Sequence, residues 1–380
     1  MSQHLCVKYL IFCFATLCML FTNGACGSAV RDVGEIQGDS IALAHSSLLS
    51  IVECDGYTVV DVRNPWKKDI YKRYVLLPKD SAVSNSLPAG TLLRVPLEHV
   101  LVFSGVHATL ISELGAVDII DGVCDAQYMY CAQVREGLNT GKVVDCGSSL
   151  NVDSERVMEV NPDAVFVLPY ENGGYGKLEN MKYPFVECAD YMEDTPLGCA
   201  EWVRFYGRLV GKTVESDSMF FAVCSEYERL SQMVSAVEAR PKLLCELKMS
   251  SAWYVPGGAS TTGRLYRDSG ADYFLSDNSS SGSVPLSFEY VLENAAEADI
   301  WLVKYNSPEN MTLASMLADV GGYAHFKAFR NGEVYGCNTH NRNIFEETSF
   351  HPERLLRELV SLFHPAILPG EKPGYYEKIR

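Results

Sequence analysis

Residues 151–170 read "NVDSERVMEVNPDAVFVLPY", and residues 284–305 read "VPLSFEYVLENAAEADIWLVKY". Each stretch carries a glutamate near its head, Glu155 in the first and Glu289 in the second, followed by a short helical pattern. Each then passes through a neighbouring Ala and Asp into an apolar run that ends in tyrosine. A helix that leads into a buried strand is the repeating unit of an α/β domain with a mostly parallel sheet. Because the unit occurs in both halves of the chain, the sequence predicts two Rossmann-like lobes.

The sequence around these units continues the alternation of strands and helices. In the first half we predict strands at 57–66 and 73–80, paired as a hairpin, further strands at 91–104, 117–124, 141–147 and 184–190, and a helix at 105–116. In the second half we predict strands at 241–258 and 332–338 and helices at 260–271, 311–320 and 351–365. Ser154 is the expected N-cap of the helix in the first quoted stretch.

Two helical stretches, 195–211 and 216–240, separate the halves. The second has apolar residues at helical spacing and is about 35 Å long at the α-helical rise. It is long enough to pass from one lobe to the other as a single backbone helix. The predicted organisation is an N-terminal α/β lobe at 41–194, a helical linker at 195–240 and a C-terminal α/β lobe at 241–380.

Composition excludes several classes of protein. The chain has 380 residues, of which 47% are apolar and 21% charged, as in globular proteins of about two domains. The formal net charge of −16 argues against a nucleic-acid-binding surface, because phosphate binding requires clustered Lys and Arg.

The first 25 residues are predicted to be a signal peptide. Lys8 precedes the apolar run "YLIFCFATLCMLF", and small residues follow it up to Cys26. Cys26 is a candidate lipidation site, with residues 26–40 as a lipoprotein tether, although Asn23 stands where lipoproteins usually have Leu. A plain cleaved signal is the alternative. Both alternatives predict an exported protein of the periplasm. If Cys26 is lipidated, the protein is also anchored to a membrane.

The cysteine pattern does not indicate a disulfide scaffold. Nine of the 13 cysteines follow the leader, an odd number, and no C-x-x-C occurs. We expect most of them to be small buried hydrophobic residues, and the count leaves room for one or two disulfides.

The order and spacing of several segments resemble the ABC-importer substrate-binding proteins for ferric siderophores, haem and vitamin B12, whose two lobes are joined by a rigid backbone helix. The segments are "VLVFSGVHATLISELGAVDIIDGV", "SERVMEVNPDAVFV", "TPLGCAEWVRFYGRLVGK", "AWYVPGGASTTGRLYRDSGADYFL" and "VPLSFEYVLENAAEADIWLV". "DVRNPW" and the tail "FHPERLLRELVSLFHPAILPG" resemble the Bacteroidetes version of the family. The resemblance implies a monomer that delivers its ligand to an ABC permease dimer of the FecCD/vitamin B12 type with its ATPase.

The resemblance also implies a role for the two glutamates. In the family, one acidic residue on each lobe meets arginines of the permease, and Glu155 and Glu289 match these positions. One carboxylate per lobe would recognise a two-fold partner by charge complementarity. The alternative is that each is a glutamate in the first turn of a helix, favoured by the helix dipole.

In this family the ligand binds between the lobes, and a large chelate requires aromatic walls and a few polar anchors. The candidate ligand-binding residues lie on loops that follow predicted strands: Tyr128, Tyr130, Tyr170, Tyr175, Trp253, Tyr254, Arg264, Tyr305, His340 and Arg342. Arg264, Arg342 and Lys304 would suit an anionic ferric siderophore, whereas the tyrosines would equally suit cobalamin. Packing is the alternative role of the aromatic residues.

The sequence gives little support for direct metal ligation. His340, His351, Glu346, Glu347 and Cys337 are close in sequence, but the eight histidines are scattered and no H-x-x-x-H pair stands on a helix. We therefore assign no metal ligand, and we leave open an axial His340 to haem iron or cobalamin cobalt.

No enzyme motif or cofactor site is predicted. "GRLVGKT" at 207–213 has three residues between its glycines where a phosphate loop has four, and no nucleophile elbow is present. The predicted function is capture of a metal chelate (a ferric siderophore, haem or cobalamin) between the lobes for an ABC importer. The alternatives are a surface lipoprotein that scavenges haem or siderophores without a permease, and uptake specific for vitamin B12.

Overall fold

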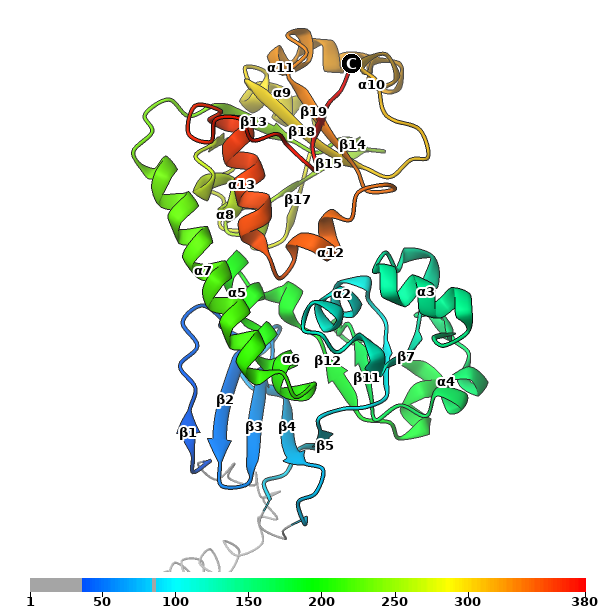
Figure 1. Ribbon diagram of the computed structural model, residues 1–380. Coiled ribbons are helices and arrows are strands. Elements are labelled where there is room, and N and C mark those ends of the chain that lie inside the picture. Colours follow the sequence, from blue (N-terminus) through cyan, green and yellow to red (C-terminus); the bar gives the residue numbers. More distant parts are fainter. Residues whose placement is uncertain (1–35, 84–86) are drawn as a thin grey trace, which may run out of the picture. The chain divides into compact units, whose positions relative to one another are not determined.

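A computed structural model describes residues 36–83 and 87–380. The predicted signal peptide, Cys26 and most of the tether lie outside the described residues. The described part begins with a five-stranded sheet in the order β1-β2-β3-β4-β5, antiparallel except for the parallel pair β4–β5 (Figure 1). Its strands are β1 (Asp39–Ser40), β2 (Leu49–Cys54), β3 (Tyr57–Arg63), β4 (Ile70–Pro78) and β5 (Thr91–Val95).

The first α/β lobe is built on a parallel sheet in the order β12-β11-β6-β7-β8. The strands are β6 (Val100–Val102), β7 (Ile120–Val123), β8 (Val144–Asp145), β11 (Ala164–Val167) and β12 (Phe185–Glu187). The helices are α2 (Gly105–Glu113), α3 (Ala132–Thr140) and α4 (Ser154–Val160), and β9 (Gly147–Ser148) pairs with β10 (Asn151–Val152) beside them. Short 3₁₀ turns η1 (Val117–Ile119), η2 (Ala126–Tyr128), η3 (Gly176–Met181) and η4 (Asp190–Met192) complete the lobe.

Three helices connect the two halves: α5 (Pro196–Glu201), α6 (Val203–Leu209) and the 23-residue α7 (Thr213–Ser235). α7 buries residues at helical spacing, among them Phe220, Tyr227 and Val234. It packs against α6 and against α8 and α13 of the second half (Figure 1). This arrangement confirms the predicted long backbone helix.

The second α/β lobe has a sheet in the order β16-β13-β18-β19-β20, parallel except for β20 at the edge. Its strands are β13 (Lys242–Cys245), β16 (Asp272–Tyr273), β18 (Ile300–Tyr305), β19 (Val334–Asn338) and β20 (Glu377–Lys378). A smaller antiparallel sheet consists of β14 (Lys248–Met249), β15 (Ala252–Pro256) and β17 (Ser283–Leu286). The helices are α8 (Thr261–Asp268), α9 (Phe288–Ala295), α10 (Leu313–Asp319), α11 (Lys327–Arg330), α12 (Ile344–Thr348) and α13 (Pro352–Phe363), and η5 (Gly321–His325) is a 3₁₀ turn.

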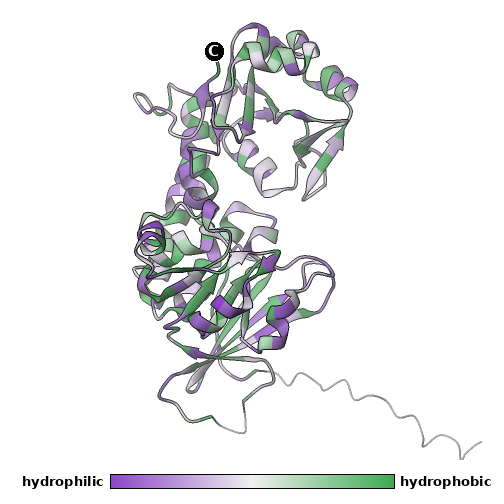
Figure 2. Ribbon diagram, turned by 90° about the vertical axis from the view of Figure 1, so that its right-hand side faces the viewer, coloured by the Kyte–Doolittle hydropathy of each residue, from purple (hydrophilic) through white to green (hydrophobic). Residues whose placement is uncertain are grey.

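Apolar residues concentrate on the strands, which are largely green in Figure 2. The largest fully buried side chains include Trp202, Trp253 and Trp301. The nine described cysteines are all free, and six of them are buried, as expected for small hydrophobic residues. In residues 36–83 and 87–380, no helix is long and apolar enough to cross a membrane.

Two local predictions are corrected. Asp153, not Ser154, is the N-cap of α4, because its carboxylate accepts hydrogen bonds from the Glu155 and Arg156 amides. The single strand expected at 91–104 is two strands in two different sheets. Pro96 lies between them, and proline has no N–H to donate to a sheet, so the ladder ends there.

Buried carboxylates attach the N-terminal sheet to the linker. Glu201 of α5 accepts hydrogen bonds from the amides of Ala44, His45 and Ser46 at 2.8–3.0 Å. Glu193 accepts from the Trp202 indole at 2.9 Å and also from the chain that follows Ser46. Two buried charges thereby satisfy backbone donors that would otherwise have no partner.

Candidate functional site

A cavity of about 530 Å³ lies outside the carboxyl ends of the first lobe's parallel strands, and Asn306 and residues within 339–346 of the second half also line it. Ligands of open α/β sheets bind at this edge, because the loops that follow the strands meet there. The volume is within the range of pockets for small molecules. The cavity is therefore the candidate functional site.

Aromatic side chains form much of the first-lobe wall. Tyr128 and Tyr130 follow β7, and Tyr170 and Tyr175 follow β11, as the sequence predicted for loop tips. Tyr128 and Tyr170 are 61% and 55% exposed, so their rings are available to a ligand. The fifth aromatic of this wall, Phe103, follows β6 and was missed by sequence analysis because its apolar strand resembles core.

The motif "ENGGYG" at 171–176 positions two of these rings. The Tyr170 hydroxyl donates to the Gly174 carbonyl at 3.1 Å, and a Cβ on Gly173 would lie 2.1 Å from the Tyr170 ring. A larger residue at position 173 would displace the Tyr170 ring from this position. The Tyr175 hydroxyl donates to Glu187, and its ring packs at a tilt against Phe185 with centroids 4.8 Å apart.

The second half supplies polar groups and one further ring. Asn306 follows β18, and Thr339, Arg342 and Asn343 follow β19. The Arg342 guanidinium forms an ion pair with Glu377 of β20. Phe345 of α12 is 55% exposed and completes the aromatic lining.

Glu346 of α12 is a cavity residue that the sequence did not assign to the ligand site. Its side chain is buried and reaches the first lobe, where it accepts hydrogen bonds from the Tyr130 amide at 3.3 Å and the Thr109 hydroxyl at 3.4 Å. A Cβ on Gly105 would lie 1.8 Å from Glu346 Oε1. Burial raises the pKa of Glu346, although the hydrogen bonds oppose this shift.

A second carboxylate of the lining comes from the first lobe. Asp125 has a left-handed backbone, with φ of 51°, and accepts a hydrogen bond from the Ser149 amide at 3.1 Å. Aspartate tolerates this conformation better than most residues. The turn places a negative charge directly after β7.

Five predicted ligand residues do not line this cavity. Trp253 is fully buried in the second-lobe core, where its indole donates to the Cys245 carbonyl at 3.0 Å, so its placement at the cleft is wrong. Tyr254, its neighbour on β15, is 48% exposed because strand residues alternate in direction. The remaining three are Arg264, Tyr305 and the exposed His340.

The two predicted docking glutamates occupy equivalent local positions. Glu155 lies in the first turn of α4 and Glu289 in the first turn of α9, and both are exposed. Neither forms an ion pair with any residue that the structure describes. Hydrogen bonds from its own amide and from the Ser287 hydroxyl lower the pKa of Glu289. Both the helix-dipole reading and the docking reading agree with this geometry.

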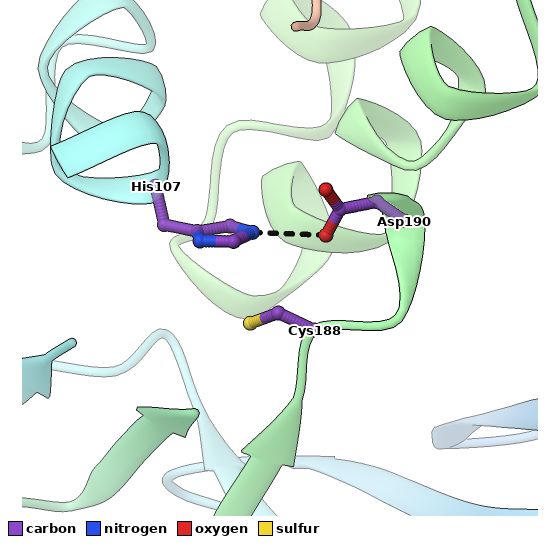
Figure 3. A group of neighbouring side chains, drawn as sticks. All are labelled: His107, Cys188 and Asp190. Carbon is purple, nitrogen blue, oxygen red and sulfur yellow. Dashed lines mark hydrogen bonds and ion pairs between the residues drawn. The ribbon is translucent and has the colours of Figure 1, made fainter. Parts of the chain in front are cut away.

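One buried group of His107, Cys188 and Asp190 has the composition of a metal site. Their donor atoms lie within 4.8 Å of one another (Figure 3). However, His107 Nε2 is 2.9 Å from Asp190 Oδ1, and the Tyr206 hydroxyl donates to the same oxygen at 2.5 Å. Burial opposes the charged form of His107, but Cys188 and Asp190 raise its pKa well above its ordinary value. The contacts describe a closed hydrogen-bond network, and the absence of metal ligation stays a prediction.

Comparison with known proteins agrees with this architecture. The sequence matches the periplasmic binding protein family over residues 101–339. It is 26% identical over 299 residues to an uncharacterized lipoprotein of Methanocaldococcus jannaschii, with 76% of this chain and 70% of that protein covered.

Two solved structures have a similar fold. One is the TroA-like periplasmic binding protein FepB from Veillonella parvula, with a TM-score of 0.57, 17% identity and coverage of 77% of this chain and 98% of that one. The other is a periplasmic heme binding protein from Pseudomonas aeruginosa, with a TM-score of 0.56, 15% identity and coverage of 75% and 98%.

Proposed function

The chain belongs to the periplasmic binding protein family, and on that premise we propose that it is the substrate-binding protein of an ABC importer. It captures a metal chelate, which is a ferric siderophore, haem or cobalamin, in the cavity between its lobes. It then delivers the chelate to a permease dimer with its ATPase, from a position in the periplasm where Cys26 anchors it to a membrane. The ligand undergoes no chemical change.

The observation that carries the proposal is the aromatic lining of the cavity. Phe103, Tyr128 and Tyr170 of the first lobe and Phe345 of the second half line an inter-lobe space of about 530 Å³. Aromatic rings bury large planar or apolar ligands well, and the polar groups at the rim orient them.

The chemistry of the lining supports binding rather than catalysis. Among the described residues that line the cavity there is no His, Cys or Lys, so no Ser–His, Cys–His or lysine nucleophile arrangement is available there. The pair of His107 with Asp190 is buried in the core and does not line the cavity.

The test is a titration of the purified protein with haemin, cyanocobalamin and a panel of ferric siderophores. Calorimetry and intrinsic fluorescence measure the binding. We expect saturable binding of one chelate with one site per chain. Tyr128→Ala or Tyr170→Ala should weaken it about tenfold or more, as expected for an aromatic anchor.

Tyr254→Ala is the matched control, because this tyrosine is also exposed but does not line the cavity. It should bind as the unaltered protein does. Failure of every chelate to bind would contradict the proposed function, and an equal loss in all three variants would contradict the site.

A further inference from the structure

The charged groups that face the cavity are predominantly acidic. Among the described residues that line it, Asp125 and Glu346 are carboxylates, and the single basic residue is Arg342. The guanidinium of Arg342 already forms an ion pair with Glu377. A chelate that enters the cavity therefore meets two carboxylates and one cation with an existing partner.

The ion pair between Arg342 and Glu377 does not by itself prevent Arg342 from binding an anionic ligand. Its side chains are 39% and 62% exposed, and an ion pair in water contributes little, so a ligand could attract Arg342 away from Glu377. Even then the cavity would offer one cation against two carboxylates. The excess of negative charge does not depend on this ion pair.

The other basic residues that suit an anionic ligand are directed elsewhere. Lys304 lines a separate cavity of about 230 Å³ and forms an ion pair with Glu246. Arg264 donates from Nε to the Ala259 carbonyl at 3.1 Å and does not line the main cavity. Neither side chain compensates the two carboxylates.

Electrostatics then separates the classes of chelate. A polyanionic complex would lose its hydration in the cavity and meet like charges at close range, and both effects cost free energy. A neutral complex avoids the repulsion, and a cationic complex gains attraction from the carboxylates and from the faces of the tyrosine rings.

We infer that the cargo is a chelate without net negative charge, such as a ferric hydroxamate, and that Glu346 and Asp125 set this preference. The inference rests on the proposed function and narrows its ligand class. It disfavours ferric catecholates, whose complexes carry net negative charge, and haem, which carries two negatively charged propionate groups.

The test compares ferrioxamine B, which is cationic, ferrichrome, which is neutral, and ferric enterobactin, which is polyanionic, by calorimetry with the purified protein. At low salt we expect the first two to bind at least about tenfold more tightly than the third. The ratio should shrink as salt is added, because ions screen the carboxylates.

Two variants assign the preference to residues. Glu346→Gln and Asp125→Asn keep the size of each side chain, and Asn also tolerates the left-handed backbone at position 125. Each should reduce the ratio about two- to tenfold by improving the binding of the anionic complex. The matched control is Glu347→Gln on the same helix, because Glu347 accepts from the Tyr375 hydroxyl at 2.8 Å and does not line the cavity.

The outcomes separate the charge preference from the proposed function. Tightest binding of ferric enterobactin or haemin would overturn the charge inference and leave the proposed function intact. Equal effects of Glu346→Gln and Asp125→Asn on all three complexes would also overturn it. Failure of every chelate to bind, cyanocobalamin included, would overturn both.

Discussion

His107 illustrates how single residues hold the first lobe to the linker. Its imidazole comes from α2, the Asp190 carboxylate from the turn after β12, and the Tyr206 hydroxyl from α6. Phe350 of the second half packs against both the imidazole and the phenol, with ring centroids 5.8 and 5.7 Å away. A buried network of this kind is stable only when all its members are present.

We expect His107→Leu to reduce the free energy of unfolding by about 3–5 kcal/mol, because Asp190 would keep its buried charge without its cationic partner. Urea denaturation with the purified protein measures this value. His340→Leu is the control, since His340 is exposed and should change stability little. Similar stability of both variants would show that the network contributes nothing.

Gly105, the first residue of α2, has a steric role that is visible only in the folded protein. A Cβ at this position would lie 1.8 Å from Glu346 Oε1 and 3.0 Å from the Tyr128 carbonyl. Gly105→Ala should displace Glu346 and lower the free energy of unfolding by about 1–3 kcal/mol, a typical cost of overpacking.

Calorimetric binding of the preferred chelate should weaken in parallel, because the displaced carboxylate lines the cavity. Gly282→Ala is the control for the same chemical change, since a Cβ on Gly282 meets nothing within 4 Å. Normal stability and binding in Gly105→Ala would mean that Glu346 moves aside freely.

At the scale of elements, the end of α2 and the start of α13 form an ionic junction between the two halves. Glu113 lies 3.0 Å from His351 Nε2 and 3.1 Å from the Arg354 guanidinium, and His351 Nδ1 lies 3.0 Å from Glu353. Burial opposes charge on both partners. Even so, the hydrogen bonds of this junction raise the pKa of His351 and lower that of Glu113.

These shifts predict the pH dependence of stability. The contribution of His351 is fully present below its unfolded pKa of about 6.5 and is lost as pH rises through the raised folded value. The contribution of Glu113 is present above about pH 4.5 and is lost as pH falls through its lowered value.

His351→Gln should therefore cost most stability at about pH 5.5 and progressively less at alkaline pH. Urea denaturation of both proteins across this range measures the difference. A pH-independent difference would mean that His351 stabilises the junction by packing alone.

The helices and strands that could be predicted from the sequence are those marked by patterns of neighbouring residues. The repeated unit predicted α4 with β11 and α9 with β18, and Pro352 does begin α13, because caps and periodicity are local patterns. The separate N-terminal sheet was not predicted. Strand patterns do not state which strands pair, and β4–β5 pairing depends on contacts made only in the folded chain.

At the scale of the whole molecule, the candidate site was predicted from sequence in part. Tyrosines after parallel strands were found because the carboxyl ends of such strands meet at one edge. Glu346 and Phe345 were not predicted as site residues. A short helix after β19 brings them to the cavity, and the spacing of residues in the sequence does not reveal this placement. Trp253 was misassigned for the converse reason, since a large aromatic near a loop can equally face the core.

Docking on a permease is the last prediction, and it concerns the whole molecule because it requires both lobes. Glu155 and Glu289 present one exposed carboxylate on each lobe at equivalent helix starts. Reversal of both charges, Glu155→Lys with Glu289→Lys, should reduce chelate uptake by cells about tenfold or more, because a basic permease surface would repel the new lysines. Calorimetric affinity for the chelate should not change.

The matched control is Glu159→Lys with Glu293→Lys, which makes the same charge change at exposed positions of the same two helices. If uptake falls equally in both double variants, the effect comes from net charge and not from docking. If neither pair affects uptake while the chelate still binds, the two glutamates act only as helix-start residues. A third outcome is that the protein binds the chelate but that deleting the protein does not change uptake by cells. The protein would then be a scavenger that works without a permease.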